Sequence, residues 1–141
     1  MRYSVLAGRI LFSLLFIVGG ISDFSSQTIA FAAAQGVPFA SVGVPLAGVL
    51  ALLGGLSIAL GYKARWGAAL LVLFLVPVTL MMHNFWAAKD PGVAQDQMVH
   101  FMKNVSLLGS ALFIFYFGSG PLSLDARKRG YSASRDERAA A

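Results

Sequence analysis

Four long stretches of the chain are almost continuously apolar, and each is close to the length that an α-helix needs to cross a membrane. They cover residues 5–21, 44–62, 66–82 and 98–117. A helix rises about 1.5 Å per residue, so roughly 20 residues cross the hydrocarbon core of a bilayer, which is about 30 Å thick. The apolar residues do not alternate with polar ones, as they do in the strands of an outer-membrane barrel. The pattern therefore predicts an all-α fold, a four-transmembrane-helix bundle within residues 1–125.

The segments that join the apolar stretches differ in kind. Residues 22–43 are partly polar, and the middle of this segment, residues 28–34, is expected to form a short helix in the membrane interface. The second joint consists of residues 63–65, so the second and third spans are expected to form an antiparallel hairpin. After Pro121 the chain turns polar and basic, and residues 126–141 are predicted to form a cytoplasmic tail that is disordered at its end.

The composition shows how much of the chain must contact lipid. A soluble domain has about 45–50% apolar and about 25% charged residues. This chain has 57% and 12%, with a mean hydropathy of +0.73, so it has too little polar surface to coat a soluble globule. The net charge of +5 does not indicate a nucleic-acid partner, because the basic residues flank apolar spans. The absence of cysteine excludes a disulfide, a thiolate nucleophile and an iron–sulfur cluster in this subunit.

The basic residues are unevenly distributed between the two sides of the predicted bundle. With the N-terminus inside the cell, nine of the eleven are cytoplasmic: Arg2, Arg9, Lys63, Arg65, Arg127, Lys128, Arg129, Arg135 and Arg138. The outer segments contain Lys89 and Lys103. Membrane insertion favours an excess of Lys and Arg on the cytoplasmic side. Both termini are therefore predicted to be cytoplasmic, in a multi-pass protein of a bacterial plasma (inner) membrane.

The second span carries small residues on one face. Gly48, Ala51, Gly55 and Ala59 follow one another at spacings of three, four and four. A smooth stripe of this kind lets a neighbouring helix approach closely. The stripe fits helix packing inside the bundle, and it also fits a contact between two copies in a homo-oligomer.

Polar and ionisable residues near the outer ends of the spans are the candidates for function, because such groups are costly inside a bilayer. Asp23 follows the first span, and His83 ends the third. His100, Lys103 and Asn104 share one face of the fourth, since they occur at positions i, i+3 and i+4. The candidate ligand-binding residues are Asp23, His83, Asn84, Trp86, His100, Lys103 and Asn104.

These residue types suit the binding of a quinone. An imidazole changes charge near physiological pH, so His83 or His100 can pass a proton to or from a quinone oxygen. Lys103 and an asparagine amide can donate hydrogen bonds to its carbonyls, and rings such as Trp86 can flank its flat ring. Two histidines are too few for a zinc site, so no metal is predicted. A haem held by the two histidines is the weaker alternative.

The same residues also have an ordinary explanation. Histidine, lysine and tryptophan are common anchors where a helix leaves the hydrocarbon, and Lys103 can extend its ammonium group toward the headgroups. The sequence therefore leaves two interpretations of this set open: the lining of a functional cavity, and a belt of interfacial anchors.

Arg9 is a separate case, because it lies on the opposite side of the bilayer. It is about 21 Å from Asp23 along the first helix, at 1.5 Å per residue. Asp125 follows the fourth span on the same side and is the expected carboxylate partner. A structural ion pair between Arg9 and Asp125 is therefore predicted.

The chain resembles the DoxX family of small membrane proteins. The resemblance rests on four pieces in order: Arg9 with residues 16–20 (FIVGG), residues 54–61 followed by Arg65, residues 103–109 (KNVSLLG) and residues 118–125 (GSGPLSLD). It implies a four-helix membrane bundle. Members have been associated with quinone-linked oxidation of thiosulfate and with redox or thiol-stress complexes that include soluble partners. Many relatives carry a glutamate where this chain has Ala51, so a proton-handling role of that carboxylate does not carry over.

Three hypotheses for the function follow. The leading one is a membrane subunit of a redox complex that handles a quinone or docks a soluble or membrane oxidoreductase subunit. The second is a non-catalytic membrane scaffold or assembly factor, and the third is a binder or transporter of a small lipophile. No side chain of this chain performs two-electron chemistry alone, so the first hypothesis needs a bound group or partner. The sequence leaves open whether the chain is itself an enzyme.

Overall fold

The computed structural model describes residues 2–128 and confirms an all-α membrane protein. Its elements are α1 (Arg2–Ser22), α2 (Ser26–Ala34), α3 (Ala40–Leu60), α4 (Ala64–Met82), the 3-10 turn η1 (Phe85–Ala87) and α5 (Pro91–Phe117). Within residues 2–128 there is no strand, and four helices, α1, α3, α4 and α5, are long and apolar enough to cross a membrane. The predicted interfacial helix corresponds to α2. The predicted disordered end of the tail lies outside the described residues.

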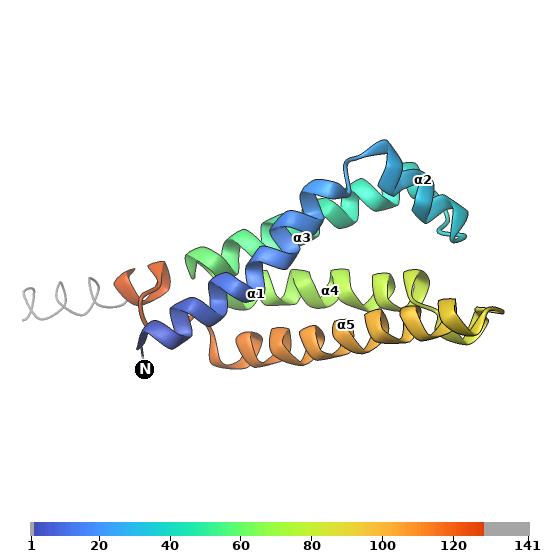
Figure 1. Cartoon of the computed structure of the whole chain (residues 1–141). Helices are drawn as coiled ribbons and strands as arrows, with labels where there is room; N and C mark the ends of the chain where they lie inside the picture. The colour runs from blue at the N-terminus through green and yellow to red at the C-terminus, as the bar shows by residue number, and fades with distance from the viewer. Residues whose placement is uncertain (1, 129–141) are drawn as a thin grey trace, which may run out of the picture.

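The four spans pack in a chain of neighbours (Figure 1). Helix α1 packs on α3, α3 on α4, and α4 on α5, while α2 packs on α3. The first and last described residues lie at the same end of the bundle, which we call the terminal end. The other end, which we call the α2 end, holds α2, η1 and the start of α5.

The start of α5 lies well before the apolar stretch that predicted this span. The carboxylate of Asp90 accepts hydrogen bonds from the backbone N–H of Gly92, at 2.8 Å, and of Val93, at 3.0 Å, and Pro91 occupies the first turn. These are the usual features of a helix N-terminus. Hydropathy marks where a helix meets lipid, whereas the cap decides where it begins.

Glycines let α3 approach a neighbour on each of two faces. A Cβ atom at Gly48 would lie 2.8 Å from the carbonyl oxygen of Gly20 in α1, and one at Gly55 would lie 3.3 Å from that of Ser13. On the other face, a Cβ atom at Gly54 would lie 2.9 Å from the carbonyl oxygen of Gly67 in α4. The small-residue stripe of the second span therefore lies against α1, with Ala51 fully buried and Ala59 half-buried.

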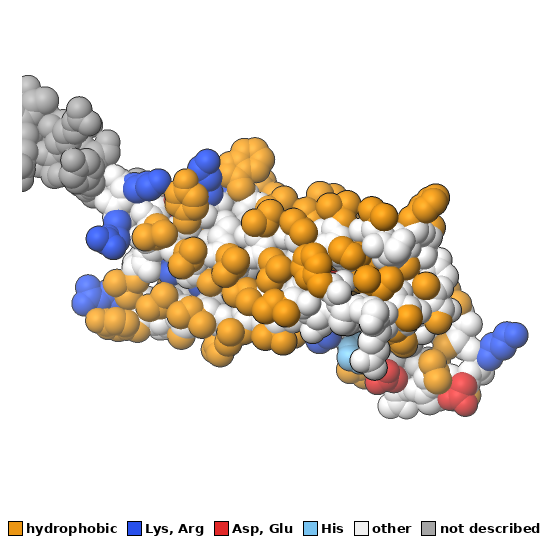
Figure 2. Space-filling model, turned by 90° about the horizontal axis from the view of Figure 1, so that it is seen from above, with side chains coloured by type: hydrophobic (Ala, Val, Ile, Leu, Met, Phe, Trp, Pro, Cys, Tyr) orange, Lys and Arg blue, Asp and Glu red, His pale blue; other side chains and the backbone are white. Residues whose placement is uncertain are grey.

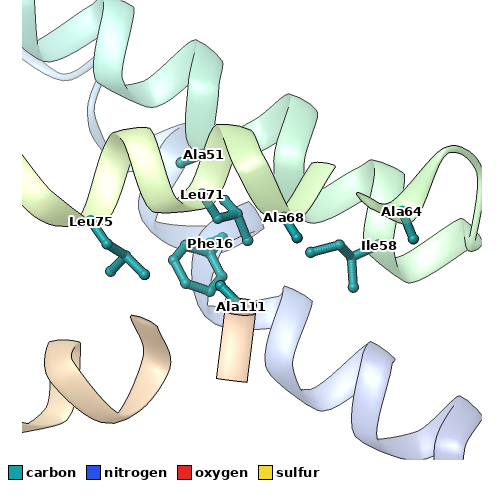
Figure 3. Close-up of a cluster of buried hydrophobic side chains, with 8 residues drawn as sticks. All are labelled: Phe16, Ala51, Ile58, Ala64, Ala68, Leu71, Leu75 and Ala111. Atoms are coloured by element: carbon teal, nitrogen blue, oxygen red, sulfur yellow. The ribbon is translucent and has the colours of Figure 1, made fainter. Parts of the chain in front are cut away.

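The main core lies where α1, α3, α4 and α5 meet (Figure 3). Half of its members are alanines, which bring the helix backbones close together, as is usual between helices in a membrane. The larger side chains fill the remaining space between the helices. The members of this core are Phe16, Ala51, Ile58, Ala64, Ala68, Leu71, Leu75 and Ala111.

The outer surface is that of a protein surrounded by lipid. Hydrophobic side chains cover the flank of the bundle, and Lys and Arg side chains gather at the terminal end (Figure 2). Large exposed apolar side chains include Leu11 at 69%, Phe113 at 67% and Leu73 at 60%. Water would disfavour so many exposed apolar groups, whereas acyl chains accommodate them.

The segment that follows α5, residues 118–125, is bound to the rest of the terminal end by two charged side chains. We call it the exit segment. The guanidinium of Arg9 donates one hydrogen bond to the carbonyl of Ser119 and another, at 2.8 Å, to that of Leu122. The carboxylate of Asp125 accepts from the backbone N–H of Lys63, at 2.9 Å, and of Ala64, at 3.4 Å, where α4 begins.

The hydrogen bonds of Arg9 and Asp125 go to backbone groups, and the ion pair between the two side chains that the sequence suggested stays a prediction. Within the described residues, Arg9 binds carbonyls of the exit segment, and Asp125 caps the N-terminus of α4. The backbone N–H of Asp125 also donates to the carbonyl of Gly61 at 2.9 Å. Charge-assisted hydrogen bonds to backbone groups thus join α1, the α3–α4 turn and the exit segment.

The orientation of the bundle in the membrane is a prediction that reporter fusions can test. Reporters fused after Ala64 and after Lys128 are expected to be cytoplasmic, because the basic residues gather at that end. Reporters fused after Phe39 and after Gln95 are expected to lie on the outer side. A cytoplasmic signal from the fusion after Gln95 would contradict this orientation.

Candidate functional site

A cavity of about 200 Å³ lies between the four spans, toward the α2 end. Each span contributes to its wall: Phe16 from α1, Ala51 from α3, Phe74 from α4 and Leu107 from α5. The wall is mostly apolar. Ala51 of α3 and two glycines of α1, Gly19 and Gly20, leave space that larger side chains would fill. The cavity is therefore a product of helix packing and is formed by no single element.

Four of the candidate polar residues line this cavity: Asp23, His83, Lys103 and Asn104. Asp23 comes from the end of α1, His83 from the end of α4, and the other two from consecutive positions of α5. Burial raises the pKa of the Asp23 carboxyl above its usual value, because the charged form is poorly solvated there. Asp23 therefore keeps its proton to a higher pH than an exposed aspartate does.

Asn104 is the most deeply buried of these four residues. It is 6% exposed, and within residues 2–128 its side-chain amide has no hydrogen-bond partner. A primary amide has two N–H donors and a carbonyl acceptor, all of them able to pair with a ligand. Its place in the cavity wall means that a ligand with a carbonyl or hydroxyl group could pair with it.

Two histidines stack beside the cavity, and one of them, His83, is in its wall. The rings of His83 and His100 lie 5.1 Å apart, centroid to centroid, at an interplanar angle of 17°. The Nδ1 atom of His83 lies 2.8 Å from the side-chain oxygen of Gln97, and the Nζ atom of Lys103 lies 3.3 Å from Nδ1 of His100. His100 Nε2 lies 3.8 Å from a carboxylate oxygen of Asp96.

These contacts assign a tautomer to each neutral ring. The Gln97 oxygen accepts, so His83 carries its proton on Nδ1 and leaves Nε2 as an acceptor. The Lys103 ammonium donates, so Nδ1 of His100 accepts and Nε2–H is directed at Asp96. Side-chain contacts thus lead from the exposed Asp96 through His100 to His83 in the cavity wall.

A second, more apolar groove of about 380 Å³ adjoins the cavity. It lies between α2, α3 and α4, and the residues that it shares with the cavity include Asp23, Phe74 and His83. The rest of its wall is largely aliphatic and includes Val44 and Met81. A ligand with a polar head and an apolar tail could therefore occupy the two spaces together.

Three of the candidate residues lie outside the cavity wall. His100 stacks on His83 and supports it, and Asn84 precedes η1, where its carbonyl accepts from the backbone N–H of Ala87. Trp86 is exposed and packs at right angles against Phe85 and Phe101. The rings that line the cavity are those of Phe16 and Phe74.

Several residues of the site were missed by the reasoning from sequence. Phe16, Phe74 and Leu107 carry no polar signal, because every span contains residues of these types. Gln97 could have been found, since it lies one helical turn before His100 on the face that also carries Lys103. Ala51 was noted as a packing residue, and it also lines the cavity.

The arrangement of donors does not fit a haem or a metal ion. The two imidazoles stack face to face, so they do not flank a common iron position. Among the described residues, no three His, Cys, Asp or Glu side chains are placed to share a metal. The amide of Asn104 can donate to a carbonyl oxygen, and the acceptor nitrogen of His83 can accept from a hydroxyl, so the two fit a neutral group that carries such oxygens.

Comparisons with known proteins identify relatives. The profile of the DoxX family matches residues 4–84. "Inner membrane protein YphA" of Escherichia coli is 29% identical over 87% of this chain and 89% of its own length. "ER-derived vesicles protein ERV29" of Saccharomyces cerevisiae is 30% identical over 59% of this chain, which is 26% of its own length. "Surfeit locus protein 4 homolog" of Schizosaccharomyces pombe is 29% identical over 52% of this chain and 25% of its own length. No solved structure matches the chain.

Proposed function

This chain belongs to the DoxX family of membrane proteins, and from that premise we propose that its cavity binds the ring of a membrane quinone within a redox complex. The observation that carries the proposal is the buried amide of Asn104, which is unpaired within the described residues and lines the cavity beside His83 and Lys103. Among the described residues, the fully buried side-chain atoms without a partner are Arg9 Nε and Ser13 Oγ, so the amide of Asn104 is open to the space of the cavity. A quinone carbonyl there could accept a hydrogen bond from this amide.

The shape of the site supports an amphiphile with a ring and a chain. The polar groups are confined to one side of the smaller cavity, where they meet the rings of Phe16 and Phe74. The adjoining groove, about 380 Å³, lies within the range of about 300–1,000 Å³ that is typical of ligand pockets. Its apolar wall suits the isoprenoid chain, while the ring occupies the cavity.

His83 and His100 are the groups that this site offers for proton exchange. His83 is in the cavity wall and has Nε2 left to accept a proton or a hydrogen bond, and His100 stacks on it and lies 3.8 Å from a carboxylate oxygen of Asp96, whose side chain is 71% exposed. When bound, a quinone would supply the two-electron chemistry that no side chain here has. Reduction of a bound quinone to a quinol would take two electrons from a soluble or membrane oxidoreductase subunit and two protons, and this chain would hold the ring and pass protons to it.

Binding of a short-chain quinone to His83→Ala, Asn104→Ala and the double variant tests the proposal. We expect each single change to weaken binding about ten-fold, since one lost hydrogen bond to a buried group corresponds to about 1–3 kcal/mol. The loss of binding free energy in the double variant should be smaller than the sum of the losses in the two single variants, because both residues act on one ligand. Ser106→Ala is the matched control, because Ser106 lies on the exposed face of α5 and donates to the carbonyl of Met102.

The same variants separate a binding cavity from a belt of interfacial anchors. If the parent protein binds no quinone, and the two substitutions have additive effects on thermal stability, the polar set is a belt. In that case the non-catalytic scaffold becomes the better account of this chain. A weakening by Ser106→Ala equal to that by Asn104→Ala would also contradict the cavity.

A further inference from the structure

A basic groove of about 440 Å³ lies at the terminal end, on the side of the bundle opposite to the cavity. Its wall is formed by the start of α4, which carries Lys63, Arg65 and Trp66, and by Lys128 just after the exit segment. The acidic residue in this wall, Asp125, accepts hydrogen bonds from two backbone N–H groups of the α4 N-terminus. Three cations and one carboxylate therefore give the groove a net positive charge.

Two of these cations gather on one aromatic ring. The Nζ atom of Lys128 lies 4.5 Å from the centre of the Tyr62 ring, and that of Lys63 lies 5.8 Å from it. The ring stabilises each ammonium group and holds both lysines at the same end of the bundle, beside the groove. An anion in the groove would be attracted by both charges.

The groove is rigid on the side where the cations are anchored. The hydroxyl of Ser57 donates to the carbonyl of Tyr62 at 2.7 Å, and the N–H of Asp125 donates to the carbonyl of Gly61 at 2.9 Å. Gly61 and Lys63 both adopt left-handed backbone conformations, with φ of 64° and 50°. These hydrogen bonds join the turn and the exit segment, which are distant in sequence, so the backbone positions from which Lys63 and Lys128 extend are fixed relative to each other.

The groove also lies at the depth of lipid headgroups. Trp66 in its wall is 73% exposed, and Tyr116 at the end of α5 is 73% exposed as well. Exposed tryptophan and tyrosine at a helix end mark the boundary between hydrocarbon and headgroups. Toward the middle of the membrane, the two acyl chains of a lipid could pack against the apolar outer faces of α4 and α5.

We propose that this groove binds the phosphate headgroup of an anionic phospholipid, with Lys63 and Lys128 on the phosphate and Trp66 beside the acyl chains. The proposal does not depend on the quinone site, which lies at the other end. It differs from the general attraction of basic residues to anionic lipids on the cytoplasmic side. In that general attraction Arg2, which lies at the same end but outside the groove, would contribute as much as a groove lysine. In a defined site, Lys63 and Lys128 contribute more to lipid binding than Arg2 does.

The protein has two tryptophans, and only Trp66 lines the groove, so it can report on the lipid beside it. Trp86→Phe leaves Trp66 as the single emitter. This variant is reconstituted in phosphatidylcholine vesicles with a small fraction of phosphatidylglycerol, and one of the two lipids is brominated near the headgroup. We expect brominated phosphatidylglycerol to quench Trp66 more strongly, per molecule, than brominated phosphatidylcholine. The converse variant, Trp66→Phe, leaves Trp86 at the other end and should show no such preference.

Lysine substitutions test which residues cause the preference of the Trp66 reporter for phosphatidylglycerol. Lys63→Gln and Lys128→Gln should each reduce it about five-fold, which corresponds to about 1 kcal/mol for each basic residue at an anionic surface. Lys63→Gln retains the backbone N–H that Asp125 accepts, so the turn should keep its fold. Arg2→Gln is the matched control and should leave the preference unchanged.

Other outcomes would overturn the proposal. An equal loss in Arg2→Gln would mean a diffuse attraction with no defined site. The absence of any preference in the Trp66 reporter would mean that the groove binds no anionic lipid. Displacement of the brominated phosphatidylglycerol by soluble glycerol phosphate at low concentration would mean that the groove takes a phosphate from solution.

Discussion

Replacing Arg9 with methionine is expected to lower the free energy of unfolding by roughly 3–5 kcal/mol. Arg9 is 4% exposed, and its guanidinium binds the carbonyls of Ser119 and Leu122. Methionine fills much of the volume but offers no donor, so two carbonyls of the exit segment would lose their partner in a medium without water. Thermal unfolding in detergent, together with limited proteolysis of the exit segment, measures the effect.

Two further variants make the Arg9 prediction specific. Arg9→Lys should recover only part of the loss, because one ammonium group does not reproduce the planar fork that reaches both carbonyls. Arg2→Met is the control, since Arg2 is exposed at the same end of α1. An Arg9→Met protein that melts like the parent, with no new cleavage in the exit segment, would contradict this role of Arg9.

The second large effect is expected from Gly48→Leu, at roughly 3 kcal/mol or more. A Cβ atom at Gly48 would lie 2.8 Å from the carbonyl oxygen of Gly20 and 2.8 Å from the Cβ atom of Asp23. A backbone carbonyl cannot escape by changing rotamer, so α1 and α3 would have to separate. At Gly55, where the nearest atoms are 3.1 Å away or more, the same substitution should cost less.

Thermal unfolding of the glycine variants in detergent checks this order. Gly8→Leu is the matched control, because a Cβ atom there meets nothing within 4 Å. We expect stability to fall from Gly8→Leu to Gly55→Leu to Gly48→Leu. Equal melting of Gly48→Leu and Gly8→Leu would mean that α1 and α3 are not in close contact in the membrane.

The spans were predictable because hydropathy is a local property. The apolar stretch at residues 44–62 corresponds to α3, Ala40–Leu60, and the stretch at residues 66–82 corresponds to α4, Ala64–Met82. The meeting of His83, Lys103 and Asn104 at one end followed from the same property, because residues at matching distances from the ends of their spans lie at matching depth. Depth in the membrane follows from counting residues.

The rotation of each helix about its axis is not a local property, and only the packing of the four spans decided it. Trp86 and Asn84 have the right depth but lie outside the cavity, while Phe16 and Phe74, which resemble other apolar residues of their spans, line it. The packing of the helices also determines the contacts between segments that are distant in sequence. Arg9 binds the carbonyls of the exit segment, and Asp125 caps α4, because the packed helices bring unpaired backbone groups within their reach. In a membrane such groups must be paired within the protein, and which side chain reaches them depends on the tertiary structure.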